Sequence, residues 1–531
     1  MACLSDPRSV SGTIFQYRSS LVLIVVMSIR VVLSSLLVLL ASSPLAFGMT
    51  TCSSCNGCGG AADIFVDVVT VGFAAFQGCE SLRTVTFSDK VESIGQFAFR
   101  YNEFMTQVSF GSNVATIGQA AFQETGLTSL IIPDSVTSLG IKAFLDCYSL
   151  KQVTFGNGLT VISEEAFQGA GLINVTIPNG VTEIAKNAFS FGDSLTHITL
   201  PTSLNTIGDY AFAQAYLESI VIPDSVTSLG IGVFVSSKLS SATLSAGLTT
   251  IPDETFRGCK LLQQYTIPNH IVSIEGRAFS QSGLTTVVIP DSVTNIGRYA
   301  FSQTSLDTVV LPNSVTSLGT GAFSSSPKIS SITFSSNLTS LGELVFSQCP
   351  LLQHVTIPSN IVSIGVRAFW KSNLTSIVIP DTVTSIGNYA FSENLHLAEV
   401  TLGSGLNYIG VRAFEATALT FISIPDTVGT VDFYAFAFNF IDCVVWKDFI
   451  GNEETVFHEN PLRGCSAMPT MAPTTLMPNI ATTNTPTVVA VNNFEITVNV
   501  EQVRNAGYAK FLFIVFIFNF LLLGTIQCYG C

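Results

Sequence analysis

Three closely spaced cysteines stand near the start of the chain, in the segment TCSSCNGC, at Cys52, Cys55 and Cys58. Thiolates at this spacing are typical of structural zinc sites, but such a site needs a fourth ligand and no histidine lies nearby. In an exported chain the same residues would form disulfides. The sequence therefore favours a disulfide-bonded N-terminal cap over a metal site, and it leaves the pairing of the three cysteines open.

Carboxylates recur in Pro-Asp pairs, and carboxylates are the usual acid and base of glycoside cleavage. In the repeated turns that end the expected strands, these aspartates are Asp134, Asp224, Asp291, Asp381 and Asp426. Glycoside cleavage requires two carboxylates a few ångströms apart, whereas no two of these aspartates occupy neighbouring repeats. Aspartate is also a common turn residue. We therefore predict no catalytic residue and a protein that is not an enzyme.

Histidines and charge give no sign of a metal, cofactor or nucleic-acid site. His197 and His354 both stand four residues before a proline but seven repeats apart, so they cannot share a metal ion. The net charge is −14 with only 11% charged residues, and no basic stripe exists to neutralise phosphates. No phosphate-binding glycine loop or hydrolase motif is visible. We predict neither a cofactor nor a nucleic-acid partner.

The elements that would position any functional residue come from one repeated block, Ile/Leu-Gly-x-x-Ala-Phe. Its phenylalanine recurs every 22 or 23 residues, in seventeen copies. These are Phe76, Phe99, Phe122, Phe144, Phe167, Phe189, Phe212, Phe234, Phe256, Phe279, Phe301, Phe323, Phe346, Phe369, Phe391, Phe414 and Phe436. A fixed period of this length indicates a solenoid whose coils bury their apolar surface against their neighbours.

One repeat, LTSIVIPDTVTSIGNYAF ending at Phe391, shows how a coil is expected to form. The alternation over 376–379 predicts a short strand with Ile377 and Ile379 inward, which the following Pro-Asp pair ends. Gly387 permits a tight or positive-φ backbone. Phe391 fills the centre of the coil, so that stacked parallel coils place the phenylalanines in one internal column.

The units from Val71 to Phe436 resemble the BspA-like leucine-rich repeats, because proline, Ile-Gly and Ala-Phe recur in register. The resemblance implies a β-rich leucine-rich-repeat solenoid of about 17 coils with parallel strands. It also implies a protein that is commonly secreted or displayed on cells and takes part in adhesion. The family shares no catalytic site, so no functional residue is implied.

The middle outward position of each expected strand is mostly threonine or valine, and it is the candidate binding face. Its threonines are Thr154, Thr176, Thr199, Thr243, Thr266, Thr333, Thr356 and Thr401. Three interpretations remain: side chains that simply suit a strand, a recognition surface for protein or glycan, or an ice-binding plane. The last is disfavoured because the neighbouring column is irregular, with residues such as Gln152, His197, Glu399 and Phe421.

Both ends of the chain carry signals of export and attachment. An apolar run over 21–47 follows Arg8 and Arg18, which places the following chain outside the cell. A Thr/Pro-rich stretch and a terminal apolar stretch follow the repeats. The expected segments are a signal peptide (starting at Met1 or Met27) or a signal anchor over 1–48, a Cys-rich N-terminal cap over 49–70, the solenoid over 71–436, a C-terminal cap over 437–465, a stalk and linker over 466–507, and a transmembrane anchor or GPI signal over 508–531.

The remaining cysteines and three glycosylation sequons complete the expectations. Cys79, Cys147, Cys259 and Cys349 each follow a repeat phenylalanine by three residues and stand at least three coils apart, which predicts buried free thiols. Cys443 and Cys465 are candidates for a capping disulfide. The sequons at Asn174, Asn337 and Asn373 are candidate N-glycosylation sites.

Together these features predict a non-enzymatic, membrane-attached glycoprotein of the cell surface that enters the secretory pathway. Its expected activity is adhesion or recognition through binding of a protein or glycan. A structural cell-wall or matrix protein is the alternative, and an ice-binding solenoid is a more distant one.

Overall fold

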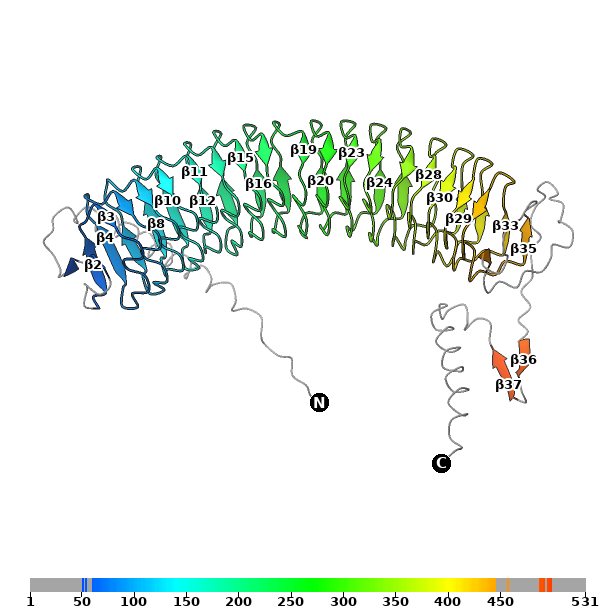
Figure 1. Ribbon diagram of the computed structural model, residues 1–531, viewed down its shortest axis with the longest axis horizontal. Coiled ribbons are helices and arrows are strands. Elements are labelled where there is room, and N and C mark those ends of the chain that lie inside the picture. The colour runs from blue at the N-terminus through cyan, green and yellow to red at the C-terminus, as the bar shows by residue number, and fades with distance from the viewer. Residues whose placement is uncertain are drawn as a thin grey trace, which may run out of the picture. The chain divides into compact units, whose positions relative to one another are not determined.

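The computed structural model describes residues 50–51, 53–54, 60–445, 456–457, 487–491 and 494–498. The chain divides into two compact units, Met1–Cys465 and Ser466–Cys531. In the first unit the coils stack side by side in chain order (Figure 1), which confirms the predicted solenoid of about seventeen coils with parallel strands.

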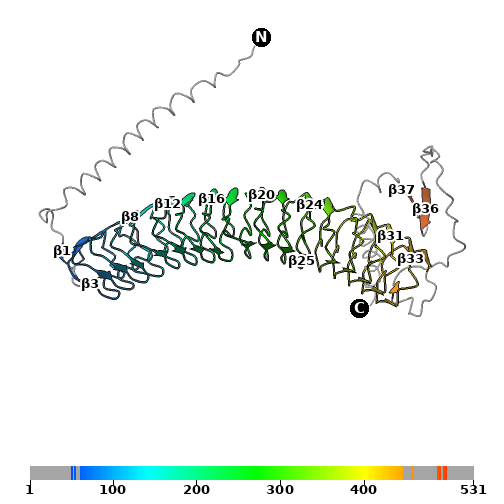
Figure 2. The ribbon, with the colours of Figure 1, turned by 90° about the horizontal axis from the view of Figure 1, so that it is seen from above.

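Most coils contribute one longer and one shorter strand, and each strand pairs in parallel with its counterpart in an adjacent coil. The longer strands are β2 (Asp63–Val66), β4 (Thr84–Phe87), β6 (Gln107–Ser109), β8 (Ser129–Ile132), β10 (Gln152–Phe155), β12 (Asn174–Thr176), β14 (His197–Thr199), β16 (Ser219–Val221), β18 (Ser241–Thr243), β20 (Gln264–Thr266), β22 (Thr286–Val288), β24 (Thr308–Val310), β26 (Ser331–Thr333), β29 (Ser376–Val378), β31 (Glu399–Thr401), β33 (Phe421–Ser423) and β35 (Cys443–Val445). Figure 2 shows β8, β12, β16, β20 and β24 following one another along one edge of the array.

The shorter strands follow the proline turns and form the second ladder. They are β3 (Thr70–Val71), β5 (Ser93–Ile94), β7 (Thr116–Ile117), β9 (Ser138–Leu139), β11 (Val161–Ile162), β13 (Glu183–Ile184), β15 (Thr206–Ile207), β17 (Ser228–Leu229), β19 (Thr250–Ile251), β21 (Ser273–Ile274), β23 (Asn295–Ile296), β25 (Ser317–Leu318), β27 (Ser340–Leu341), β28 (Ser363–Ile364), β30 (Ser385–Ile386), β32 (Tyr408–Ile409) and β34 (Thr430–Val431). At the N-terminal end β1 (Thr50–Thr51) pairs with β2. The first longer strand, β2, lies within the segment 49–70 that is expected to be the N-terminal cap.

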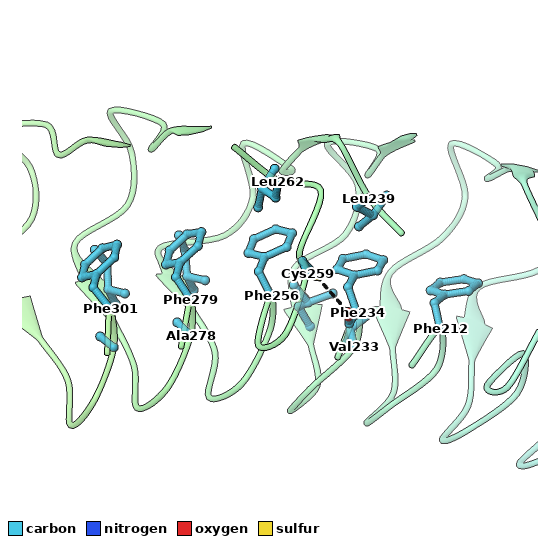
Figure 3. Packing of buried hydrophobic residues seen from close by; sticks show 14 of the residues in the cluster. Phe212, Val233, Phe234, Leu239, Phe256, Cys259, Leu262, Ala278, Phe279 and Phe301 are labelled. Atoms are coloured by element: carbon cyan, nitrogen blue, oxygen red, sulfur yellow. Dashed lines mark hydrogen bonds between the residues drawn. The ribbon is translucent and has the colours of Figure 1, made fainter. Parts of the chain in front are cut away.

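The repeat phenylalanines form the predicted internal column, and none of the seventeen is more than 1% exposed. Neighbouring rings stack nearly parallel; the centroids of Phe279 and Phe301 are 5.2 Å apart and those of Phe301 and Phe323 are 5.3 Å apart. Figure 3 shows this stacking from Phe212 to Phe301. The column is longer than the sequence indicated, because Phe457 stacks on Phe436 at 5.5 Å. Its block, Thr-Val-Phe, lacks the alanine that marks most copies.

The turn around each phenylalanine has an unusual backbone. The residues two before and two after the phenylalanine have positive φ in every coil; around Phe301 they are Tyr299 (φ 55°) and Gln303 (φ 57°). This alternation directs the N–H groups of Tyr299, Phe301 and Gln303 towards the next coil, where they donate to carbonyl oxygens at 2.9, 2.8 and 2.9 Å. Three hydrogen bonds thus join successive coils at the turn.

The glycine of the Ile-Gly pair does not supply these positive φ values. The φ of Gly387 is not positive. The glycine is instead required by close packing between coils, because a Cβ at Gly387 would lie 2.7 Å from backbone atoms of Gly365 and Val366, too close for a real Cβ. The left-handed positions are instead Tyr389 and Glu393. Non-glycine residues rarely adopt this conformation, so the three hydrogen bonds and the stacked ring must hold them there.

The repeat cysteines occupy a buried polar position between coils. Cys147, Cys259 and Cys349 are free and buried, as predicted. The Cys259 thiol donates to the carbonyl oxygen of Phe234 at 3.1 Å (Figure 3). The same position holds Asn102, whose amide donates to Phe76 O and Phe99 O at 2.8 Å each.

The prediction of a free thiol at Cys79 is wrong, because Cys79 is disulfide-bonded. Its partner is none of the other three repeat cysteines, which are free. Cys79 belongs to the first coil, which meets the N-terminal segment through β1 instead of a preceding coil. The distance between coils, which separates the repeat cysteines from one another, therefore does not prevent a disulfide at Cys79. Cys52, Cys55 and Cys58 lie outside the described residues.

In the second unit, β36 (Thr487–Val491) and β37 (Phe494–Val498) form an antiparallel hairpin. This hairpin falls within the segment expected to be a stalk and linker. The signal segment 1–48, the apolar segment 508–531 and Cys465 lie outside the described residues. Among the residues that are described, no helix is long and apolar enough to span a membrane.

Replacing Phe301 with alanine tests how far damage spreads in the column. We expect a local cost of about 3–5 kcal/mol, as for other buried aromatic side chains. Because coils contact only their neighbours, hydrogen exchange should accelerate in the coils of Phe279, Phe301 and Phe323 and stay slow towards both ends. Equal acceleration in all coils would contradict the nearest-neighbour picture.

The buried thiols provide a second test of the core. Burial raises the pKa of the Cys147 and Cys259 thiols to about 11 and that of Cys349 to about 12. Since the thiolate is the reactive form, a maleimide at pH 8 should leave all three unmodified in the native chain and label them in guanidinium chloride. Mass spectrometry of tryptic peptides measures the labelling, and rapid native labelling of any of the three would refute this packing.

Candidate recognition surface

The long strands place the predicted threonines on the outer face of the array. Alternation along each strand turns the first and third residues outward and the second inward, and the predicted threonines stand at the third position; in β20, Gln264 and Thr266 are exposed while Tyr265 is buried. All eight predicted threonines are exposed. This row of outward side chains, from Ile131 in β8 to Ser423 in β33, is called the strand face below.

The strand pairings set these threonines opposite both threonine and valine. Thr176 and Thr199 are paired across β12 and β14, whereas Thr266 is paired with Val288 and Thr401 with Val378. The strand face is therefore a mixed threonine and valine surface. Its apolar members are widely exposed, with 67% of Val221 and 62% of Val310 accessible to water.

The longer strands pair mostly in twos, and the coil of Thr356, between β26 and β29, is a further break because it has no longer strand. Residues 352–358 form no strand, and a hollow of about 410 Å³ opens there, lined by His354, Thr356, Val378 and Pro380 among others. Parallel strands normally close such a gap with hydrogen bonds. The interruption makes the strand face locally distinct, which the uniform repeat did not indicate.

The column beside the threonines is as irregular as predicted. Its members Gln152, His197, Glu399 and Phe421 are all exposed. His197 contacts Thr196 Oγ1 at 3.0 Å through Nδ1. Among the described residues no group of three or more histidine, cysteine or carboxylate side chains could hold a metal ion.

Three of the five Pro-Asp aspartates join successive coils. Asp134, Asp224 and Asp381 each accept a hydrogen bond from a backbone N–H of the following coil, at 2.7, 2.9 and 2.7 Å. The hydrogen bond from the Ser404 N–H, together with that from its hydroxyl, lowers the pKa of the Asp381 carboxyl. A carboxylate held ionised by backbone donors suits this structural role.

The three sequons differ in access. Asn174 is exposed on β12. The side-chain amide of Asn337 donates to the Asn313 carbonyl at 2.8 Å, and the side-chain oxygen of Asn373 lies 2.7 Å from Nδ1 of His396. Asn174 is thus the sequon least engaged by the fold, and glycosylation stays a prediction. The Cys443–Cys465 disulfide also stays a prediction, since Cys465 is not described.

A second surface feature, which the sequence did not predict, lies on the turns between Tyr148 and Phe191. A hollow of about 550 Å³ opens there, with Gly169 and Gly171 between the two aromatic residues. The signal in the sequence was a pair of glycines two and four residues after Phe167, with an aromatic residue at one of these two positions in the coil on either side.

Comparison with solved structures finds leucine-rich-repeat proteins of bacteria. One from Bacteroides ovatus is 24% identical over 68% of this chain and 84% of its own, with a TM-score of 0.46. A leucine-rich cell-surface protein from Faecalibacterium prausnitzii is 26% identical over 68% and 96%, with a TM-score of 0.37. The pneumococcal vaccine antigen PcpA is 20% identical over 66% and 84%, with a TM-score of 0.37.

No curated protein matches the chain. The family model of the BspA type leucine rich repeat region matches it in six copies, over residues 62–132, 115–240, 182–305, 227–352 and 326–443. These matches extend over well more than half of the sequence and coincide with the described coils. The protein therefore belongs to the BspA type leucine rich repeat family.

Proposed function

We propose that the array is the ligand-binding region of an exported, non-enzymatic cell-surface protein that recognises a protein or glycan and thereby supports adhesion. The observation that carries this proposal is the strand face. Core packing does not use its side chains, and its apolar members, such as Ile131, Val288 and Val378, are 59–69% exposed. Exposed apolar side chains recur along this face among the threonines, and exposed apolar surface bordered by polar residues is typical of interaction sites.

Export and membrane attachment are supported by sequence features alone. The apolar run over 21–47 follows Arg8 and Arg18, and no basic residue follows it until Arg83, a charge asymmetry that favours transfer of the following chain across a membrane. The terminal apolar segment within 508–531 supports attachment through a transmembrane span or a GPI anchor.

A structural cell-wall or matrix role and ice binding remain the rival functions. A matrix role predicts outer columns that are uniform along the array, whereas the hollow beside Thr356 makes this face locally distinct. Ice binding requires a regular plane, and the exposed column containing His197 and Glu399 interrupts such a plane. Both observations favour recognition of a discrete ligand.

Lysine placed on the strand face separates these functions. Thr266→Lys and Thr356→Lys should strongly reduce binding of the labelled full-length chain to printed arrays of glycans and cell-surface proteins, because each adds bulk and charge to the face. Their melting curves should match the parent, with stability changes of a few tenths of a kcal/mol, as for most surface substitutions.

Ser228→Lys and Ser340→Lys, at exposed positions of the short strands β17 and β27, are the matched controls and should bind like the parent. Unchanged binding by both threonine variants would move the site off the strand face and favour the matrix role. If the parent inhibits ice recrystallisation and both threonine variants lose this inhibition, an ice-binding face would be established instead.

Processing of the N-terminus is open to direct measurement. If the segment starting at Met27 is a cleaved signal peptide, material recovered from the cell surface should begin near Met49, after the small residues Ala46 and Gly48. Edman sequencing or terminal-peptide mass spectrometry gives the answer. Intact Met1 on surface material would refute cleavage and leave an uncleaved anchor.

A further inference from the structure

The hollow on the turn side of the array is built by three successive coils, those of Phe144, Phe167 and Phe189. Its volume of about 550 Å³ lies within the range of small-molecule sites, roughly 300–1,000 Å³. The first and third coils form its two walls and the second forms its floor. Since coils stack at about 4.8 Å, the walls stand roughly 10 Å apart, which leaves room for one ring-shaped ligand.

Each wall carries one aromatic ring and one carboxylate, at the second and fourth residues after the phenylalanine. The first wall has Asp146 and then Tyr148, and the other has Phe191 and then Asp193. Both rings are open to solvent, with 66% of Tyr148 and 46% of Phe191 exposed. Phe191 also has a positive φ of 57°, a conformation in which bulky residues are uncommon.

The floor is open because the middle coil has glycine at the same two positions. A Cβ at Gly171 would collide with the carbonyl oxygen of Tyr148, and a Cβ at Gly169 would collide with Oδ1 of Asp146. Gly169 also has a positive φ of 67°. A side chain at either position would therefore fill the space between the walls.

The polar groups around the hollow include both donors and acceptors. Lys151 Nζ donates to the Tyr148 carbonyl at 3.3 Å and lies 2.6 Å from where a Cβ of Gly171 would be. Burial raises the pKa of the Asp146 carboxyl; hydrogen bonding with the Tyr148 hydroxyl opposes this rise, and the charges of Glu124 and Glu165 add to it. The carboxylates can accept hydrogen bonds, and Lys151 can donate them.

We propose that this hollow is a glycan-binding subsite that holds one neutral sugar residue between Tyr148 and Phe191. The rings would pack against the C–H face of the sugar, and Asp146 and Asp193 would accept hydrogen bonds from its hydroxyl groups. This inference rests on the proposed recognition function and assigns it a ligand class and a second location, away from the strand face.

Other ligand classes satisfy the site less well. Two carboxylates repel a phosphate or sulfate, and a wholly apolar ligand would bury them without hydrogen-bond partners. A lysine or arginine side chain of a partner would suit the rings and the carboxylates, but Lys151 already places a cation at the floor. A neutral ligand rich in hydroxyl groups uses the rings, the acceptors and the donor together.

Binding of neutral hexasaccharides to the full-length chain tests the proposal. The probes are the β-linked hexamers of glucose, mannose, galactose and N-acetylglucosamine, measured by saturation-transfer NMR and calorimetry. At least one should bind, and Tyr148→Ala and Phe191→Ala should each weaken it tenfold or more, which corresponds to about 1.4 kcal/mol. Tyr148→Phe should retain most of the affinity, because the ring is kept.

Tyr216→Ala is the matched control, because Tyr216 stands four residues after Phe212, as Tyr148 does after Phe144, and is exposed outside the hollow. It should bind like the parent, and all variants should melt like the parent. Failure of every hexamer to bind, or binding that is indifferent to Tyr148 and Phe191, would overturn the subsite. The subsite would also be overturned if binding of an octa-arginine peptide depended on these two rings while binding of the hexamers did not.

The subsite and the strand face can fail separately. Thr266→Lys and Thr356→Lys should leave hexasaccharide binding intact if the sugar occupies the hollow. If those two variants abolish binding to the printed arrays while no hexamer responds to Tyr148→Ala, the strand face stands and the subsite falls. Loss of hexamer binding in Tyr148→Ala alone, with unchanged array binding by the lysine variants, supports the subsite against the strand face.

Discussion

The turn around the repeat phenylalanine is the interaction on which the rest of the array depends. There, three backbone N–H groups donate to the next coil while one ring stacks on the next, as in the step from Phe301 to Phe323. These contacts require two left-handed residues per coil, and a left-handed conformation costs a non-glycine residue on the order of 1–2 kcal/mol. That cost is offset only when the adjacent coil is present to accept the hydrogen bonds and cover the ring. Isolated coils are therefore unstable, and the array must be capped at its ends.

Both ends show how this constraint is met. At the C-terminal end the Phe436 N–H donates to the Val456 carbonyl at 3.1 Å, and Phe457 covers the last repeat ring. At the N-terminal end β1 pairs with the first long strand, and Cys79 is held in a disulfide. A disulfide constrains the unfolded chain, which suits a first coil that has a coil neighbour on one side only.

Separation of core and surface leaves the outside of each coil free to vary. Within the column, the ring and the inward strand residues pack against one another. The buried side chain three residues after the phenylalanine hydrogen-bonds to backbone carbonyl groups, as Asn102 does to two of them. Outward residues contribute little to this packing, so a change in one coil alters the surface locally. The strand face arises from a residue type that recurs in most coils. The hollow between Tyr148 and Phe191 arises from two glycines, Gly169 and Gly171, in a single coil.

The sequence by itself determined the period, the parallel stacking, the phenylalanine column and the outward direction of the strand threonines, because each follows from a pattern that recurs in register. Only the tertiary structure decided the features that depend on what an adjacent coil presents. The left-handed residues at Tyr389 and Glu393 have no glycine to mark them, since neighbouring carbonyl groups hold them in place. The hollow required Gly169 and Gly171 to lie between walls made by two other coils, and the disulfide at Cys79 involves none of the other three repeat cysteines. A single period describes one coil and its copies, whereas these features arise from contacts between neighbouring coils or from differences among them.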